Sequence, residues 1–266
     1  MRRTPSRAAR DGPSMGWLRD WRRRRALAKH HVDEALWARA VSPLKFLGGL
    51  APQEAHRLRE LALLFLAEKE FSGARGLVLT DHMRLSIAAQ ACLPILELGI
   101  DWYDGWSGVI VYPGDFRVRR EDVDEDGVVH EYDDELAGES WPGGPVVISW
   151  DAAAHDTEMA VVVHEFAHKL DMRNGDADGM PPLHAGMDRA RWSRVWRDAY
   201  EGFCDALDRD KETWLDPYAA EHPSEFFAVV SEAFFLSPNE TRRRYPELYE
   251  QLKLFYRQDP AGRQPM

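Results

Sequence analysis

The sequence predicts an α+β fold: a small mixed sheet beside several helices, one of which carries the motif His-Glu-x-x-His. Two observations predict this class. Apolar residues recur at helical spacing in the first and last parts of the chain, and short runs of Val, Ile and Tyr between Gly and Pro indicate strands in the middle. The 266 residues, 44% of them hydrophobic and 30% charged, are sufficient for the sizeable core of a soluble protein.

The N-terminal part of the chain is expected to contain two helices. Residues 54–71 place Leu58 and Leu61 on one face. A second helix is expected over residues 82–98, which are largely apolar and contain Pro94, a residue that can kink a helix.

The middle of the chain is expected to form strands, because the apolar pattern changes there and β-branched and aromatic residues dominate. Strands are predicted over residues 108–113, 128–132 and 145–150. The acidic run at 121–126 is followed by Gly127 and is therefore expected to be a turn.

After residue 150 the chain is expected to return to helix. The helix with the His-Glu-x-x-His motif has Asp156 or Thr157 as its expected N-cap and Asn174-Gly175 as its stop signal. Further helices are expected over residues 188–207, 224–236 and 246–256.

The motif itself is His164–His168. Four residues make about one helical turn, so the two imidazoles project from the same face and can hold one Zn²⁺ ion. Glu165 points off that face, where it can take a proton from a metal-activated water, as in zinc peptidases. The alternative is a pair of structural core histidines. The mostly apolar residues at 158–163, which precede the motif, favour a buried helix. Two histidines on the protein surface would not need such a helix.

Two histidines leave a zinc site incomplete. Glu225 and Glu232 follow the helix-start signal Pro223-Ser224 within an apolar run, where a carboxylate is costly unless it is paired or metal-bound. We favour Glu225 as the third ligand. Glu232, about two turns later on the same face, could orient a histidine or Glu225. His184 and His222 remain alternatives without supporting context.

Two further features lie beside the motif. Residues 174–179 match the first six positions of a calcium loop, but position twelve is Ala185 and Pro181-Pro182 interrupts the pattern, so a turn that caps the helix is expected. Asp171 shares the face of the two histidines. It either orients an imidazole or a neighbouring backbone group, or only helps to end the helix.

The net charge of −11 is unevenly spread, because residues 1–30 hold ten Lys or Arg and only two Asp. We expect residues 1–30 to be a basic, disordered tail and 31–266 a single domain, helical over about 40–100 and catalytic over about 101–260. Contact of the tail with an acidic partner surface or with anionic lipid is the alternative. The acidic remainder argues against nucleic acid as a direct partner.

The sequence also indicates the cellular compartment. No run approaches 18 apolar residues, so no membrane span is expected, and no apolar run of the needed length follows the N-terminal arginines, so no secretion signal is expected. Cys92 and Cys204 lie in predicted helices and are expected to be reduced thiols. These features favour the cytoplasm.

Several separated blocks of the chain resemble the Mlc titration factor A family of bacterial zinc metallopeptidases, which is related to the lethal-factor type of toxin metallopeptidase. The likeness covers about residues 40–260 and rests on 93–99, 164–171, 173–176 and 218–235. In both groups a Tyr lies seven residues before the ligand Glu, as Tyr218 does before Glu225.

The resemblance implies a zincin-like fold in which His164, His168 and Glu225 bind one Zn²⁺, Glu165 is the general base and Tyr218 stabilises the oxyanion. It also implies aminopeptidase-like activity and the binding of a sugar-responsive transcriptional repressor, which no motif in this chain shows. By analogy with zinc peptidases, the strand at 145–150 is expected at a sheet edge, where a peptide substrate pairs through its backbone.

Three functions therefore follow as hypotheses. The first is a cytoplasmic zinc peptidase that acts on peptides or proteins. The second is an interaction protein that sequesters a transcriptional repressor and has only secondary peptidase activity. The third is a zinc hydrolase that acts on a non-peptide amide. The intact Glu165 favours an enzyme, because a binding module has no use for that base.

Overall fold

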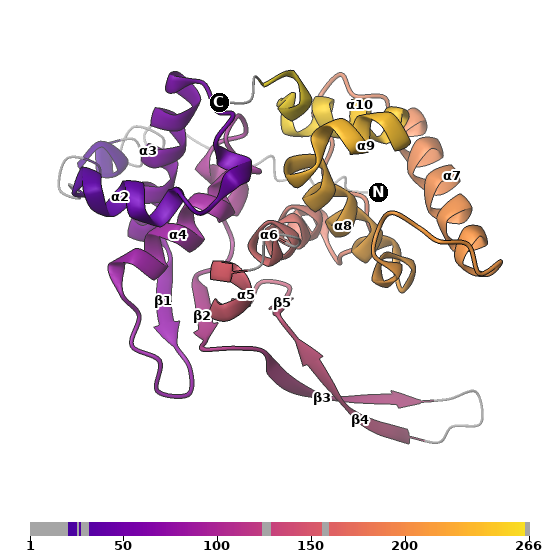
Figure 1. Ribbon diagram of the computed structural model, residues 1–266, viewed down its shortest axis with the longest axis horizontal. Helices are drawn as coiled ribbons and strands as arrows, with labels where there is room; N and C mark the ends of the chain where they lie inside the picture. The colour runs from indigo at the N-terminus through magenta and orange to yellow at the C-terminus, as the bar shows by residue number, and fades with distance from the viewer. Residues whose placement is uncertain (1–20, 26, 28–31, 124–128, 156–159, 264–266) are drawn as a thin grey trace, which may run out of the picture.

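The computed structural model describes residues 21–263, apart from residues 26, 28–31, 124–128 and 156–159. Its helices are α2 (Glu34–Val41), α3 (Pro52–Glu68), α4 (Asp81–Cys92), α5 (Trp150–His155), α6 (Val161–Asp171), α7 (Arg189–Leu207), α8 (Pro223–Leu236), α9 (Pro238–Arg244) and α10 (Pro246–Tyr256). Short 3₁₀ turns are η1 (Lys45–Leu47), η2 (Ile100–Tyr103), η3 (Met172–Asn174), η4 (Pro217–Ala220) and η5 (Pro260–Gly262). Figure 1 shows α2 to α4 on one side of the molecule, α7 to α10 on the other, and α6 between them.

The strands are β1 (Glu70–Gly73), β2 (Gly108–Tyr112), β3 (Phe116–Val123), β4 (Val129–Leu136), β5 (Gly138–Ser140) and β6 (Val146–Ser149). Four of them form one sheet in the order β1-β2-β6-β5. The first two pairs are parallel and β5 pairs with β6 antiparallel, so the sheet is mixed, as predicted. All four β6 residues are buried, which suits a strand with a neighbour on each side.

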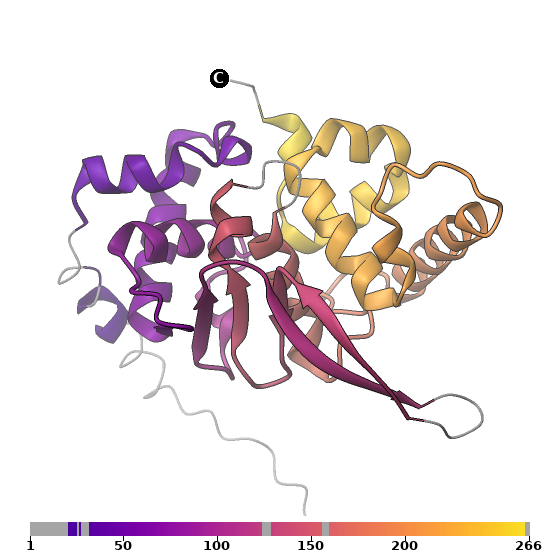
Figure 2. The same cartoon turned by 60° about the horizontal axis from the view of Figure 1, so that its bottom comes forward.

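Strands β3 and β4 form a separate antiparallel ribbon, paired from Phe116 with Leu136 to Val123 with Val129. Figure 2 shows this ribbon extending away from the helices as an arm. At its base, the chain passes directly from β4 through Ala137 into β5.

The central helix α6 is held by aromatic packing on one side. The Phe166 ring lies 5.5 Å from the Phe65 ring and 5.1 Å from the Tyr103 ring, centroid to centroid. Helix α8 also packs against α6 and is itself covered by α7, where the Trp196 and Phe227 rings are 5.3 Å apart. Such contacts between buried aromatic rings add to the stabilisation that burial provides. Helix α6 is thus fixed between the N-terminal and C-terminal helices.

The C-terminal helices confirm the sequence prediction closely: α7, α8 and α10 begin and end within one residue of the predicted bounds. The Asn174-Gly175 stop signal is also confirmed, because α6 ends at Asp171 and η3 ends at Asn174. Cys92 and Cys204 lie in α4 and α7 and are unpaired.

Both predicted N-terminal helices end earlier than expected. Helix α3 stops at Glu68, and the residues that follow pair with β2 as strand β1, with Phe71 against Phe65 at 5.9 Å. Helix α4 stops at Cys92 because Pro94 has no N–H to continue it. Residues 93–98 form turns instead, so the expected kink at Pro94 is wrong.

Other expectations need correction in the middle of the chain. Strand β6, predicted at 145–150, is not an edge: β2 and β5 flank it, and β5 is the last strand of the described sheet on that side. The acidic run at 121–126 is not simply a turn, because 121–123 belong to β3, while 124–127 lie outside the described residues. The predicted strand at 128–132 is β4, described from Val129.

The expected N-cap residues Asp156 and Thr157 lie outside the described residues. Helix α6 begins at Val161, and Ala160 occupies the N-cap position. Most of the expected tail at 1–30 also lies outside them. Within it, residues 21–25 are helical, and Arg23 forms ion pairs of 2.8 Å with Glu68 and 2.7 Å with Asp101. This short piece therefore contacts the folded body.

Across the described residues, none of the helices is both long enough and apolar enough to cross a membrane.

Candidate metal centre

Helix α6 places the two motif histidines on one face. Its opposite faces are filled by Val162, Val163, Phe166 and Leu170, which are fully buried. His164 and His168 lie on the other side of the helix and point toward α8, and their rings lie 5.0 Å apart. The local cause is the spacing of the apolar residues, which fixes the rotation of the helix in the core.

Helix α8 brings the third group. His222 is its N-cap and accepts a hydrogen bond from the Ser224 N–H, and Pro223 occupies the first helical position. Glu225 follows in the first turn, where the helix dipole favours a carboxylate. Its Oε2 lies 3.2 Å from Nε2 of His164 and 3.2 Å from Nε2 of His168. Within the described residues, these three side chains form the one cluster with metal-ligand geometry.

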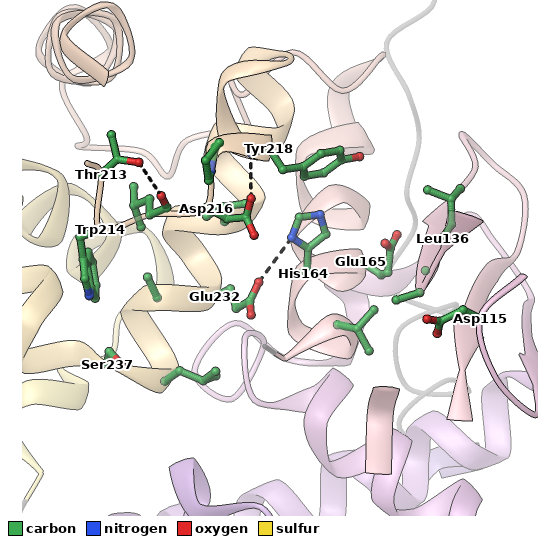
Figure 3. A pocket seen from close by; sticks show the side chains of 18 residues that line it. Asp115, Leu136, His164, Glu165, Thr213, Trp214, Asp216, Tyr218, Glu232 and Ser237 are labelled. Carbon is green, nitrogen blue, oxygen red and sulfur yellow. Dashed lines mark hydrogen bonds and ion pairs between the residues drawn. The ribbon is translucent and has the colours of Figure 1, made fainter. Parts of the chain in front are cut away.

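Glu232 lies behind His164 rather than beside the cluster. Its Oε2 is 3.5 Å from Nδ1 of His164, and its Oε1 accepts a hydrogen bond of 2.5 Å from the Ala160 N–H. The carboxylate thus links the start of α6 to the far nitrogen of the imidazole. Figure 3 shows its contact with His164. This is the position of a group that orients a ligand histidine.

Glu165 lies close to the strand β5. Its side chain is only 5% exposed, and its Oε2 has no hydrogen-bond partner among the described residues. A Cβ atom on Gly138 would lie 2.5 Å from Glu165 Oε1 and 2.6 Å from its Cγ, so a larger residue there would displace the Glu165 side chain. Burial raises the pKa of Glu165. A buried carboxylate of raised pKa, free to accept a proton, has the properties of a general base.

Tyr218 comes from η4, the turn before α8. The Asp216 side chain caps this turn by accepting a hydrogen bond of 2.9 Å from the Tyr218 N–H. The Tyr218 ring is 41% exposed and lies 6.3 Å from the His164 ring. Figure 3 shows the two rings side by side at the edge of the cavity that His164 and Glu165 line.

The electrostatics of the cluster favour positive charge. Burial lowers the pKa of His164, but hydrogen bonds to Glu225 and Glu232 outweigh that effect and raise it to about 10. Burial likewise raises the pKa of Glu225, but its hydrogen bonds to the two histidines bring it well below the usual range. The carboxylates therefore hold a proton on His164 when nothing else supplies positive charge, and a metal ion must displace that proton to bind.

The alternative ligands proposed from the sequence do not reach the cluster. His184 Nε2 is 2.7 Å from the carbonyl oxygen of Phe255, and His222 Nδ1 is 2.8 Å from the Ser224 hydroxyl. The segment that resembles a calcium loop is a turn: Asn174 donates to the Met180 carbonyl, and Asp178 accepts from the Met180 N–H. The prediction of a turn there is confirmed.

Asp171 binds a backbone group rather than an imidazole. It is fully buried, and its Oδ2 accepts a hydrogen bond of 2.7 Å from the Gly179 N–H. Its Oδ1 has no partner among the described residues. Gly179 has φ +77°, and a Cβ there would lie 2.6 Å from the Pro223 carbonyl oxygen. Asp171 thus fixes the loop after α6 against the start of α8.

Sequence reasoning missed Lys169, which follows the second motif histidine. Its ammonium group donates to the carbonyl oxygens of Trp141 at 2.6 Å and Gly144 at 2.9 Å, in the turn between β5 and β6. It also lies 5.1 Å from the centre of the Trp106 ring, a cation–π distance. The helix that carries the histidines therefore also holds the strand β5. The sequence signal was a lysine at a position where the helical pattern requires burial.

We expect Asp171→Asn to stabilise the metal-free protein at neutral pH. Burial raises the pKa of Asp171 to about 6, so ionisation costs the folded state more than the unfolded state, and stability is lost as pH rises from about 4 through about 6. Asparagine keeps the acceptor for Gly179 and removes that loss. Urea unfolding at pH 7.5 should show a gain on the order of 1–3 kcal/mol that vanishes at pH 4. An equal loss of stability at both pH values would contradict this account.

We expect Lys169→Met to loosen the turn between β5 and β6. Hydrogen exchange of the Gly144 amide, which donates to the Trp141 carbonyl, should become roughly tenfold faster, because hydrogen bonds from a charged group contribute about 1.5–3 kcal/mol. Lys69→Met is the matched control: Lys69 contacts the same Trp106 ring but donates to the carbonyls of Tyr103 and Trp106. The same acceleration in both variants would contradict a specific role for Lys169.

Comparison with known proteins places the chain in a family. Residues 18–257 match the glucose-regulated metallo-peptidase M90 family. Mlc titration factor A of Klebsiella pneumoniae subsp. pneumoniae is 39% identical over 239 residues, covering 86% of this chain and 88% of that protein. Mlc titration factor A of Yersinia pestis is 37% identical over 235 residues, 86% of each chain. An uncharacterized protein of Synechocystis sp. is 38% identical over 250 residues, 92% of this chain and 90% of that protein. The chain belongs to the glucose-regulated metallo-peptidase M90 family.

Proposed function

We propose that this protein is a zinc-dependent peptidase that removes residues from the amino terminus of peptides. One observation carries the proposal: two imidazole nitrogens and a carboxylate oxygen converge within 4.8 Å of one another, next to the buried carboxylate of Glu165, whose Oε2 has no hydrogen-bond partner among the described residues. A metal site alone could be structural. Hydrolysis also needs a base beside the metal ligands, and Glu165 is not one of the three converging side chains.

The donor set suits Zn²⁺. His164, His168 and Glu225 supply two nitrogens and one oxygen, the set that leaves one position open in catalytic zinc sites. The carboxylates of Glu165 and Glu232, in addition to that of Glu225, also favour a cation at the cluster. A Zn²⁺ ion bound there would supply a Lewis acid that acidifies water and polarises the carbonyl of the bond to be cleaved.

We assign a separate role to each of three further side chains of this protein. Glu165 accepts the proton of the attacking water and returns it to the leaving amine, for which its raised pKa is suited. The Tyr218 hydroxyl donates to the negative charge that develops on the carbonyl oxygen. Glu232 holds the imidazole of His164 in its orientation through Nδ1.

The shape of the site supports removal of amino-terminal residues. A cavity of about 680 Å³ lies on the side of the cluster near the start of α6, and one of about 210 Å³ lies on the other side, near Met172 and Ala177. A site with little room on one side of the cleaved bond accepts few residues there. We assign that short side to the amino-terminal end of the substrate.

A second candidate function is the binding of a transcriptional repressor. Two of the three relatives described above carry the name Mlc titration factor A, and we propose that this chain likewise sequesters a repressor protein, with the peptidase regulated by or secondary to that interaction. A repressor acts in the cytoplasm, which is where we propose that this protein works. Binding would use the surface of the protein and not the base Glu165.

The first test concerns the ligands. His164→Ala, His168→Ala and Glu225→Gln should each lose most of the bound zinc, measured by atomic absorption after dialysis. Glu232→Gln should lower zinc affinity less, by roughly 10–100-fold, because Glu232 acts on His164 and not on the ion. A larger loss in Glu232→Gln than in Glu225→Gln would reverse the assignment of the two glutamates.

The second test separates chemistry from binding. Glu165→Gln should retain zinc and lose peptide hydrolysis by at least about 10²-fold, the lower range for loss of a general base. Tyr218→Phe should retain zinc and lose activity by about tenfold or more. Capture of a repressor should survive both changes. If Glu165→Gln cleaves peptides as fast as the wild type, the peptidase proposal fails and the interaction protein becomes the better account.

A further inference from the structure

The two cavities lie at opposite ends of the candidate metal centre, along the axis of α6. The larger one is lined by Val161, His164 and Glu165, from the first half of the helix. The smaller one also contains His164 and Glu165, but extends to His168 and Met172 at the helix end. A substrate held over the three metal-binding candidates therefore extends from one cavity into the other.

Strand β5 runs along the same axis and has a definite direction. Leu136 and Gly138 line both cavities, whereas Ala137 lines only the larger one, and Glu139 and Ser140 line only the smaller one. Ser140 is fixed to α6, because its hydroxyl donates to the carbonyl oxygen of Glu165 at 2.8 Å. The chain of β5 thus passes from the larger cavity, beside Glu165, to the smaller one.

This strand is the natural place for the backbone of an extended peptide. Within the described sheet, β6 pairs with one side of β5 and β5 is the last strand in the order. Peptides commonly bind by adding a strand to such an edge, and antiparallel pairs are slightly more stable per residue than parallel ones. A peptide that pairs antiparallel with β5 has its amino-terminal residues beside Ser140 and its carboxyl-terminal residues beside Ala137. Its amino-terminal end lies in the smaller cavity, and the residue after the cleaved bond reaches the larger one.

The chemistry of the larger cavity indicates which side chain it accepts. About half of its lining is apolar, from side chains that include Leu136, Val161, Leu215, Val229, Ala233 and Leu236. The exposed side chains of Asp115 and Asp216 also line it and bring negative charge to its opening. Figure 3 shows Asp115 and Asp216 on opposite sides of His164 and Glu165. Transfer of an apolar side chain from water into this cavity lowers the free energy, and the two aspartates repel a carboxylate.

We propose that the larger cavity is a specificity pocket that binds an apolar side chain on the residue directly after the cleaved bond and rejects an acidic one. This inference rests on the proposed peptidase function and adds its substrate class: peptides whose second residue is apolar, if cleavage removes the first. Selectivity of about tenfold or more between Leu and Ala is expected, since a hydrophobic pocket discriminates by roughly 10-fold or more per methylene.

The test uses two sets of probes on the zinc-loaded protein. The first is a series of peptides, Ala-X-Gly-Ser-Tyr, with X as Leu, Ala or Glu, in which kcat/KM for release of the first residue is measured by mass spectrometry. The second is a series of hydroxamates that chelate the metal and carry one side chain, isobutyl, methyl or carboxyethyl, on the carboxyl-terminal side of the chelator. Their Kd values are measured by calorimetry and do not depend on turnover.

Two variants locate the pocket. Ala233→Phe fills the larger cavity from α8, and Ala177→Phe fills the smaller one as a matched control. Zinc content is measured for both. The wild type should prefer Leu over Ala by about tenfold or more and disfavour Glu most, both as substrate and as hydroxamate. Ala233→Phe should abolish the preference at X, and Ala177→Phe should preserve it.

Equal Kd values for the isobutyl and methyl hydroxamates would overturn the inference. So would a preference at X that Ala177→Phe abolishes and Ala233→Phe preserves, because the peptide would then run in the opposite direction. If the hydroxamates show the expected preference but no peptide is cleaved, the pocket stands and the proposed peptidase function fails.

Discussion

The carboxylate of Glu225, placed between two imidazoles, is the interaction on which the rest of the site depends. His164 and His168 come from α6 and Glu225 from α8, so the cluster exists only while the two helices stay packed. Glu165 and Glu232 add two more carboxylates within a small buried volume. Such a group of charges is unfavourable in a protein interior unless a cation balances it. The raised pKa of His164 is the response of the metal-free protein to that imbalance.

The surrounding fold fixes the cluster from several directions. Phe166 packs α6 against Phe65 and Tyr103 of the N-terminal part, and Glu232 holds the start of α6 through the Ala160 N–H. Asp171 holds the loop after α6, and Lys169 holds the turn beyond β5. These contacts leave α6 little freedom to rotate. A helix held in this way keeps His164, Glu165 and His168 in fixed positions relative to strand β5.

The sequence predicted those parts of the site that follow from local spacing. His164 and His168 are four residues apart in an apolar helix, which settles their common face without tertiary information. Glu225 and Glu232 could not be separated in that way, because both lie on one face of α8 two turns apart. Their roles differ only because α6 crosses α8 with His164 between them, which brings the Nε2 of that histidine to Glu225 and its Nδ1 to Glu232. The choice of Glu225 agrees with this geometry.

Strand β5 was missed because Gly138–Ser140 is too short to show an alternating pattern, and its pairing with β6 is a long-range contact. Strand β1 was missed for a similar reason, because Glu70–Gly73 follows α3 directly and only its pairing with β2 makes it a strand.

The coordination of the bound ion tests the central claim most directly. Zinc-edge X-ray absorption on protein loaded with one equivalent of zinc reports the ligand atoms around the metal, without reliance on activity. The account predicts two imidazole nitrogens at about 2.0–2.1 Å together with oxygen from Glu225 and solvent. It further predicts that one imidazole disappears from the spectrum of His164→Ala. A third imidazole, a thiolate sulfur from Cys92 or Cys204, or an unchanged spectrum in His164→Ala would contradict it.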